Sequence, residues 1–415
     1  MNTFEKDRQY YKFCFYGFLK NLRFFEAFLL LFFLESGLSF FQIGWLYAVR
    51  EISRNLFEIP AGFISDGIGR KKTMVTSFSV YILGFLLFYF SGSFWLFVLP
   101  MILMAVGDAF RSGTHKAMIF DYLKAKGWAD QKVTYYGHTR SWSQMGSAIS
   151  ALLAATVVFL GDEYRIIFLF SIVPYILDLI NLATYPSYLN GTIAKNPGTN
   201  FRASLKRIWQ EFAYTFRNSI VLKAIGNQSF YTGFYKSLKD YIQPMLQALA
   251  IASPLLITLP DKKRTSILIG LFYFGMFFLN AVSSRNSKNF LLLFSSQRTA
   301  LNTSFLLGIG LATVSSLFYL KGHLIAAVLC FACIYFVENL RKPIGISFIA
   351  ENIPSGIMAS VLSVESQVHS ITAAVLAPLT VWLADLFGIG YALLLICGVA
   401  ILISPLIVLP MRGKD

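Results

Sequence analysis

The stretch that decides the fold reads Gly62-Phe-Ile-Ser-Asp66-Gly-Ile-Gly69-Arg70-Lys71-Lys72, and it lies between two apolar runs. Gly69 permits a tight turn because it has no side chain. Asp66 and Arg70 can form a charge-assisted pair across this turn that holds two helix ends together. A pair that breaks and forms again gives a protein a bistable element for a conformational change. The alternative is that the basic residues at the end of the stretch only mark the side of a membrane on which the loop lies.

The composition around this stretch is that of a membrane protein. Of the 415 residues, 56% are hydrophobic, 16% are aromatic and only 14% are charged. A soluble domain of this size needs far more charge to cover its surface. Runs of about 20 apolar residues, enough to cross a hydrocarbon core of roughly 30 Å, recur along the whole chain. We therefore expect a lipid bilayer to surround much of the protein.

The apolar runs predict twelve transmembrane helices, six on each side of a central polar segment. They cover residues 10–34, 40–65, 73–92, 94–123, 132–160, 164–186, 218–252, 265–284, 299–320, 322–349, 356–386 and 388–410. We expect an all-α polytopic membrane protein with an N-terminal six-helix bundle over 1–188, a cytoplasmic linker over 189–216 and a C-terminal six-helix bundle over 217–415. An apolar stripe over 201–216 is typical of an amphipathic helix at a membrane surface.

Lysine and arginine residues predict the orientation of the chain. The net charge is +15, but the basic residues recur in short segments between apolar runs. Membrane topology therefore explains the excess better than nucleic acid binding. With the N-terminus inside, inner basic residues such as Arg298 and Arg341 outnumber outer ones such as Arg165 and Lys262 by about four to one. We expect both termini in the cytoplasm and the protein in the cell inner (plasma) membrane.

The quoted stretch resembles the signature loop of the major facilitator superfamily, G-x-x-x-D-x-x-G-R-[KR], and it follows the second predicted span as that loop does. Ser112-Gly113-Thr114 and Arg341-Lys342-Pro343 resemble segments of the drug-efflux-like branch of its bacterial members. The resemblance implies two six-helix bundles and secondary transport by alternating access. In the superfamily an acidic residue at the inner end of the fourth span joins the charge network of the loop. The gating residues that the resemblance implies are Gly62, Asp66, Gly69, Arg70, Lys71 and Asp121.

Three departures separate this sequence from that branch. The fifth span lacks the antiporter signature and has only small residues at Gly146-Ser147-Ala148. Met358 stands where these relatives carry an arginine, and the second copy of the signature loop is degraded over 281–288. The departures put direct transfer of drug/proton antiport in doubt.

Ionisable residues inside the predicted spans indicate the charge of the solute that the protein binds. Each costs about 2.5–3.5 kcal/mol at the bilayer centre, so it needs a partner or a function. Within the predicted spans the cations outnumber the carboxylates. A cationic surplus around a cavity attracts carboxylate or phosphate, which predicts a small anionic or zwitterionic solute. The expected substrate-binding residues are Arg23, Arg50, Arg54, Arg111, Lys116, Arg140, Tyr231, Tyr235 and Lys239.

Several of these residues have an alternative reading as buried ion pairs that hold helices in register. Arg50 with Glu26, or Arg54 with Glu58, are two pairings that the sequence leaves open. Proton coupling is also expected, because buried carboxylates and imidazoles can exchange protons near neutrality. The candidate coupling residues are Glu26, Asp108, His115 and Glu365.

Two other functions compete with transport of an anion. One is proton-coupled efflux of drugs and organic cations, and the other is a non-transporting membrane sensor on the same fold. An enzyme is not expected, because the sequence has no H-E-x-x-H, no phosphate-binding Gly-Lys-Ser/Thr loop and no G-x-S-x-G. We expect no cofactor and no metal. The expected partners are a small-molecule substrate, a coupling proton and the lipid bilayer, with no nucleic acid, and the protein is expected to be a monomer.

Overall fold

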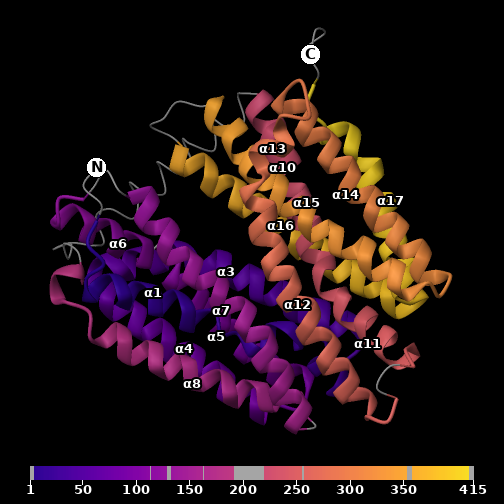
Figure 1. Cartoon of the computed structure of the whole chain (residues 1–415), viewed down its shortest axis with the longest axis horizontal. Helices are drawn as coiled ribbons and strands as arrows, with labels where there is room; N and C mark the ends of the chain where they lie inside the picture. Colours follow the sequence, from indigo (N-terminus) through magenta and orange to yellow (C-terminus); the bar gives the residue numbers. More distant parts are fainter. Residues whose placement is uncertain are drawn as a thin grey trace. The chain divides into compact units, whose positions relative to one another are not determined.

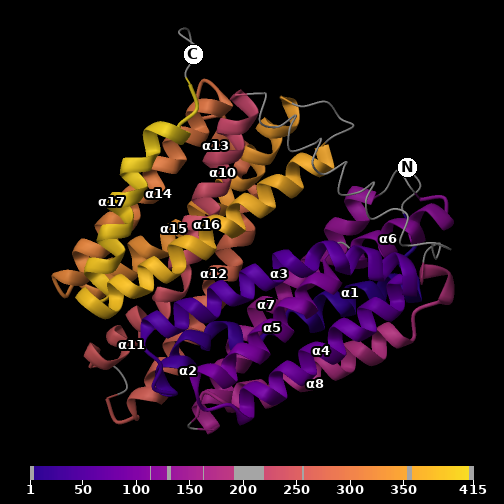
Figure 2. The ribbon, with the colours of Figure 1, turned by 180° about the vertical axis from the view of Figure 1, so that it is seen from behind.

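The computed structural model describes residues 4–112, 114–128, 132–161, 163–190, 219–254, 257–352 and 358–410. Every regular element within these residues is helical, as Figures 1 and 2 show from opposite sides. This confirms the all-α expectation.

The helices of the first half follow the six predicted spans. They are α1 (Arg8–Lys20), η1 (Phe24–Ala27), α2 (Leu29–Glu35), α3 (Phe40–Ile68), α4 (Arg70–Phe90), α5 (Phe94–Arg111), α6 (Thr114–Ala125), α7 (Lys132–Gly161), α8 (Ile166–Ala183) and η3 (Ser187–Asn190).

The helices of the second half follow the remaining six spans. They are α10 (Ser219–Leu238), η4 (Lys239–Tyr241), α11 (Ile242–Ala252), α12 (Asp261–Arg285), α13 (Ser287–Leu291), α14 (Gln297–Leu320), α15 (Leu324–Glu351), α16 (Met358–Phe387) and α17 (Ile389–Ile407). Among the described residues, eight helices are long and apolar enough to cross a membrane.

The first predicted span is not one continuous helix. Within the predicted span 10–34, α1 ends at Lys20 and η1 begins at Phe24, so the residues between them interrupt the helix. Asn21 ends α1: its side-chain amide donates to the Gly17 carbonyl oxygen at 2.7 Å. A side chain that bonds a terminal carbonyl in this way competes with continuation of the helix.

Two compact units make up the chain. Unit 1 contains Met1–Ser36, Ser53–Phe201 and Lys262–Phe277, and unit 2 contains Gly37–Ile52, Arg202–Asp261 and Phe278–Asp415. In unit 1, α4 packs against α5 and α8, and α1 packs against α7 and α8. In unit 2, α14 packs against α15 and α17, and α10 packs against α16. The predicted surface helix over 201–216, and all but the first two residues of the predicted linker, lie outside the described residues.

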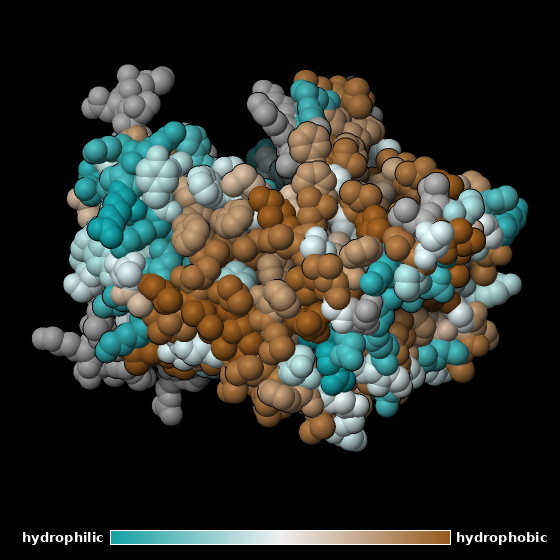
Figure 3. Space-filling model, turned by 60° about the horizontal axis from the view of Figure 1, so that its bottom comes forward, coloured by the Kyte–Doolittle hydropathy of each residue, from teal (hydrophilic) through white to brown (hydrophobic). Residues whose placement is uncertain are grey.

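The surface exposes large apolar side chains, as a bilayer requires. Trp95 is 80% exposed, Leu402 79% and Phe90 75%. On the face in Figure 3, hydrophobic residues cover broad continuous areas, and hydrophilic residues gather in separate patches. Apolar areas of this extent on a soluble monomer are rare, so the surface supports a membrane environment.

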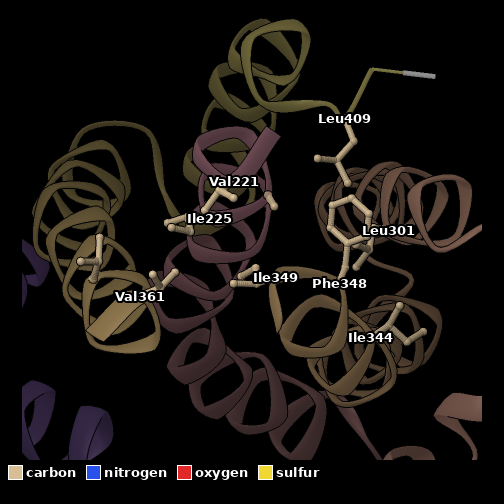
Figure 4. Close-up of a cluster of buried hydrophobic side chains, with 10 residues drawn as sticks. Val221, Ile225, Leu301, Ile344, Phe348, Ile349, Val361 and Leu409 are labelled. Atoms are coloured by element: carbon tan, nitrogen blue, oxygen red, sulfur yellow. The ribbon is translucent and has the colours of Figure 1, made fainter. Parts of the chain in front are cut away.

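One apolar cluster in unit 2 fixes α10 against α14, α15 and α16 (Figure 4). Val221 and Ile225 of α10 face Ile349 of α15 and Val361 of α16 in this cluster. These side chains are at most 2% exposed. The packing holds the polar residues that follow along α10 next to those that precede Ile349 on α15.

Candidate functional site

The signature stretch forms a turn that is followed by an ion pair and a hydrogen bond to neighbouring segments. Gly69 precedes α4 with φ at +94°, a backbone conformation that favours glycine. Arg70 forms an ion pair with Asp121 of α6. Lys71 Nζ donates to the Tyr185 carbonyl oxygen at 2.8 Å. The surroundings of Gly62 and the side chain of Asp66 lie outside what the structure describes. Arg70 is therefore joined to the fourth predicted span, as the resemblance implies.

A buried charge cluster lies in unit 1 around Asp108 of α5. Asp108 Oδ1 accepts from Tyr81 Oη at 2.5 Å and from Arg111 Nη2 at 3.1 Å. Arg23 Nη2 lies 3.6 Å from the same oxygen, and Asp108 is only 6% exposed. Asp108 thus brings together two predicted binding residues, Arg23 and Arg111, which are 88 positions apart in the sequence. It acts here as a counter-ion for both.

A polar cavity of about 220 Å³ opens beside this cluster among α1, α6 and α7. Its lining residues are Phe13, Tyr16, Gly17, Lys20, Asn21, His115, Ile119, Thr139, Arg140, Ser143 and Gln144. Two of these lining residues, Lys20 and Arg140, are cations, and none of them is a carboxylate. Hydroxyl and amide groups from α7 supply further donors. The cavity therefore suits a small solute that carries a negative group.

An aromatic wall backs the cavity. The rings of Tyr16 and His115 stack with centroids 3.6 Å apart and planes inclined by 18°. Lys20 Nζ lies 5.5 Å from the Tyr16 ring centroid, within cation–π range. His115 Nε2 lies 3.3 Å from Tyr185 Oη. These contacts hold the ring of His115, a predicted coupling residue, in one orientation.

A second carboxylate lies behind Lys20. Asp178 of α8 is fully buried, and its Oδ1 accepts from Asn181 Nδ2 at 3.2 Å. Its Oδ2 has no hydrogen-bond partner among the described residues. Lys20 and Arg111 both interact with Asp178 electrostatically. Neither Lys20 nor Asp178 is among the site residues predicted from the sequence.

Of the other predicted residues of the first half, one lines the cavity and the rest do not. Arg140 lines the cavity, but Lys116 is exposed, with its Nζ 5.5 Å from the ring centroid of Phe120. Glu26 is also exposed. Arg50 and Arg54 are half-buried on α3 and do not line the cavity.

Glu58, the alternative partner considered for Arg54, accepts a hydrogen bond from Ser112 Oγ at 3.1 Å. The Glu58 side chain thus meets the break between α5 and α6. The predicted binding residues of the first half that this region gathers are Arg23, Arg111 and Arg140.

The predicted residues of the second half do not form one open site within the described part of the chain. Tyr231 is fully buried, and its ring lies under the Arg341 guanidinium at 4.3 Å. Gly308 makes room for this ring, because a Cβ there would collide with the Tyr231 hydroxyl. Tyr235 meets the ring of Tyr335 edge-on at 5.1 Å. Tyr231 is therefore a packing residue in this structure, and its contact with a solute stays a prediction.

The charged candidates of unit 2 are close to other charged groups. Lys239 Nζ lies 3.6 Å from Asp240 Oδ1, and Lys236 Nζ lies 3.7 Å from Glu51 Oε2. Glu365 is half-buried, and its carbonyl oxygen accepts from Ser229 Oγ at 3.0 Å. These contacts give no single anion site among the described residues of unit 2.

Two buried charges are absent from the predicted site residues. Arg341 was expected on an inner segment, but it lies inside α15 and is 0% exposed. Glu338, one turn before it, is 4% exposed. The signal was present, because both residues fall inside the predicted span 322–349 and are three positions apart.

Comparisons with known proteins agree with this architecture. Residues 18–364 match the family model described as "Major Facilitator Superfamily". A protein of Bacillus subtilis (strain 168), "Uncharacterized MFS-type transporter YxaM", is 24% identical over 223 residues. That match covers 54% of each protein, so it spans about half the length of this relative.

Solved structures share the fold at low identity. The nucleoside transporter NupG superposes with a TM-score of 0.75 at 12% identity, covering 97% of this chain and 98% of that one. A bacterial homologue of the human lysosomal transporter Spinster gives 0.74 at 13% identity, covering 97% of each chain. A D-xylose–proton symporter gives 0.67 at 14% identity, covering 98% of this chain and 97% of that one.

Proposed function

This chain belongs to the major facilitator superfamily and is a multi-pass membrane transporter, and we propose that it moves a small anionic or zwitterionic solute by alternating access with a coupled proton. We place it in the inner membrane with both termini in the cytoplasm, as a monomer. The Arg70–Asp121 pair serves as part of the inner latch, whose formation and loss accompany the cycle.

The observation that carries this proposal is the lining of the polar cavity in unit 1. Lys20 and Arg140 bring two positive charges to a space of about 220 Å³ whose lining includes no carboxylate among the described residues. Arginine forks suit carboxylate and phosphate, and lysine supplies a point charge. A hydrogen bond to a charged group contributes about 1.5–3 kcal/mol. Loss of either cation is therefore expected to weaken binding by roughly 10- to 100-fold.

Efflux of hydrophobic compounds has one observation in its favour. A second cavity in unit 1, of about 630 Å³, is lined mainly by apolar side chains of α1, of the segment that follows α1, and of α7 and α8, among them Leu22, Leu153 and Phe170. Ligand pockets of about 300–1,000 Å³ with apolar walls are common in proteins. The drug-efflux-like branch suggested by the sequence therefore remains the second candidate.

A thermal-unfolding screen of the detergent-purified protein separates the two. The panel contains inorganic phosphate, a monocarboxylate, a dicarboxylate, a zwitterionic amino acid and lipophilic quaternary ammonium cations. A solute that binds only the folded state at 100 times its Kd stabilises the protein by about 2.7 kcal/mol. We expect stabilisation by an anion or zwitterion.

Matched variants assign that stabilisation to the cavity. Lys20→Ala and Arg140→Ala are expected to remove most of it. Lys124→Ala and Arg165→Ala are the controls, because Lys124 is exposed, the Arg165 side chain is 41% exposed, and neither lines the cavity. Stabilisation by quaternary ammonium cations alone, unchanged in all four variants, contradicts the anion proposal and places efflux first.

A further inference from the structure

Unit 2 contains a second buried polar cluster, centred on Arg341 of α15. The Arg341 side chain is 0% exposed, and its Nη2 donates to Asn227 Oδ1 at 2.5 Å. The guanidinium lies 4.3 Å from the ring centroid of Tyr231 and 5.8 Å from that of Phe305. Its Nε has no hydrogen-bond partner in the described part of the chain. Arg341 is thus held by an amide and by aromatic rings.

Glu338 lies three residues before Arg341 on the same helix. Its Oε1 accepts from Thr232 Oγ1 at 2.9 Å, but its Oε2 has no hydrogen-bond partner among the residues that the structure describes. Glu338 and Arg341, both among the described residues, form no ion pair within 4.0 Å. The Glu338 side chain bonds to Thr232 instead, and the Arg341 side chain bonds to Asn227. A buried ionised carboxylate without a close counter-ion is strongly disfavoured.

Gln228 completes the cluster from α10. Its Nε2 donates to Thr232 Oγ1 at 3.4 Å, so Gln228 and Glu338 meet at the same hydroxyl. The Gln228 Oε1 atom is buried and lacks a donor among the described residues. Two acceptor oxygens of one cluster, Glu338 Oε2 and Gln228 Oε1, therefore receive no hydrogen bond from the described residues. A proton on Oε2 removes the buried charge and provides the donor that the cluster lacks.

Other charged groups surround Glu338 from its own and neighbouring helices. Lys342 of α15, Lys236 of α10 and Glu365 of α16 interact with it electrostatically, in addition to Arg341. Lys342 is exposed, and Lys236 lies close to Glu51. The cation nearest in sequence and deepest in the cluster is Arg341, which can pair with Glu338 once the carboxyl is ionised.

We propose that Glu338 is a proton-binding site of unit 2, occupied as the neutral acid in this structure, and that Arg341 becomes its counter-ion after the proton leaves. On release, the O–H bond of Oε2 breaks, its electron pair stays on the oxygen, and the proton passes to water. Arg341 then exchanges Asn227 for the carboxylate. The use of this site for coupling rests on the proposed transport function, whereas the protonation itself does not.

Infrared spectroscopy of the full-length protein tests the protonation without any solute. The carboxylic-acid C=O stretching band is followed from about pH 5 to about pH 9, the range in which buried carboxyls titrate. A protonated-glutamate band is expected at neutral pH in the wild type, absent in Glu338→Gln and retained in Glu351→Gln. Glu351 is a matched control, because it is exposed at the end of the same helix. An acid band whose intensity is unchanged in Glu338→Gln overturns the proposal.

Isotope-labelled glutamate separates glutamate bands from aspartate bands without replacing Glu338. Glu338 is the buried glutamate among the described residues and Glu365 is half-buried, so a label-shifted acid band at neutral pH that persists in Glu365→Gln belongs to Glu338. Absence of that band means that the carboxylate is ionised and that ordered water satisfies the cluster, which also overturns the proposal. Arg341→Gln tests the pairing: the band is expected to persist to higher pH in this variant, and an unchanged titration refutes the role of Arg341.

Discussion

Replacement of Asp108 by asparagine removes the shared counter-ion of Arg23 and Arg111 and preserves the shape of the side chain. At an effective dielectric constant of about 20, unit charges at the observed separations of 3.1 and 3.6 Å attract each other by about 5 kcal/mol each. Solvent near the partly exposed arginines recovers some of this loss. We expect Asp108→Asn to lower the free energy of unfolding by about 3–5 kcal/mol, as for other buried pairs that lose one partner.

Tyr81 provides an independent check on the same oxygen. Tyr81→Phe removes a hydrogen bond to a charged group, which costs about 1.5–3 kcal/mol. In the Asp108→Asn background the same change removes a neutral bond of about 0.5–1.5 kcal/mol. The double-mutant cycle is therefore expected to show a coupling energy of about 1 kcal/mol.

Equilibrium unfolding in detergent, followed by loss of helical circular dichroism, measures these differences. Tyr89→Phe, on the same helix as Tyr81, is the control, because this hydroxyl makes no hydrogen bond to the described residues; we expect a change within about 0.5 kcal/mol. Stability of Asp108→Asn within about 0.5 kcal/mol of the wild type would refute the counter-ion reasoning. Additive effects of the two substitutions would refute the shared bond.

Two further substitutions test local geometry by the same unfolding assay. Gly69→Ala is expected to lower the free energy of unfolding by about 1–3 kcal/mol, because φ is +94° at this residue. Gly275→Ala, in an open helical position, is the control and is expected to be neutral or stabilising by up to about 1 kcal/mol. Equal effects of the two substitutions contradict the strain argument. Asp385 accepts from the backbone N–H groups of Phe40 and Phe41 at 2.9 and 2.6 Å, so Asp385→Ala is expected to cost about 0.5–2 kcal/mol and Asp385→Asn less. A neutral alanine variant shows that this cap does not stabilise α3.

The helices were predictable because apolar runs of membrane-spanning length dominate this sequence. The break between Lys20 and Phe24 was not, because it lies where the Asn21 side chain bonds the Gly17 carbonyl oxygen, a local contact that the apolar pattern does not contain. Hydrophobicity averaged over a span does not register such a local competition.

The binding residues were only partly predictable for a different reason. The surplus of cations identified Arg23, Arg111 and Arg140, but not which of them share a carboxylate. Asp108 meets Arg23 only through the packing of distant helices. Arg341 was counted among the inner basic residues because basic residues near span ends usually report topology. Its burial depends on Asn227 and the aromatic rings around it, which sequence spacing does not reveal.

The most direct test of the central claim is solute flux in proteoliposomes. The anion or zwitterion that most stabilises the protein in the thermal screen is supplied as a radiolabelled compound, with an imposed pH gradient. We expect uptake above that of empty liposomes, dependent on the gradient and lost in Lys20→Ala but not in Lys124→Ala. Binding without any flux in the wild type would contradict transport and favour a membrane sensor on this fold.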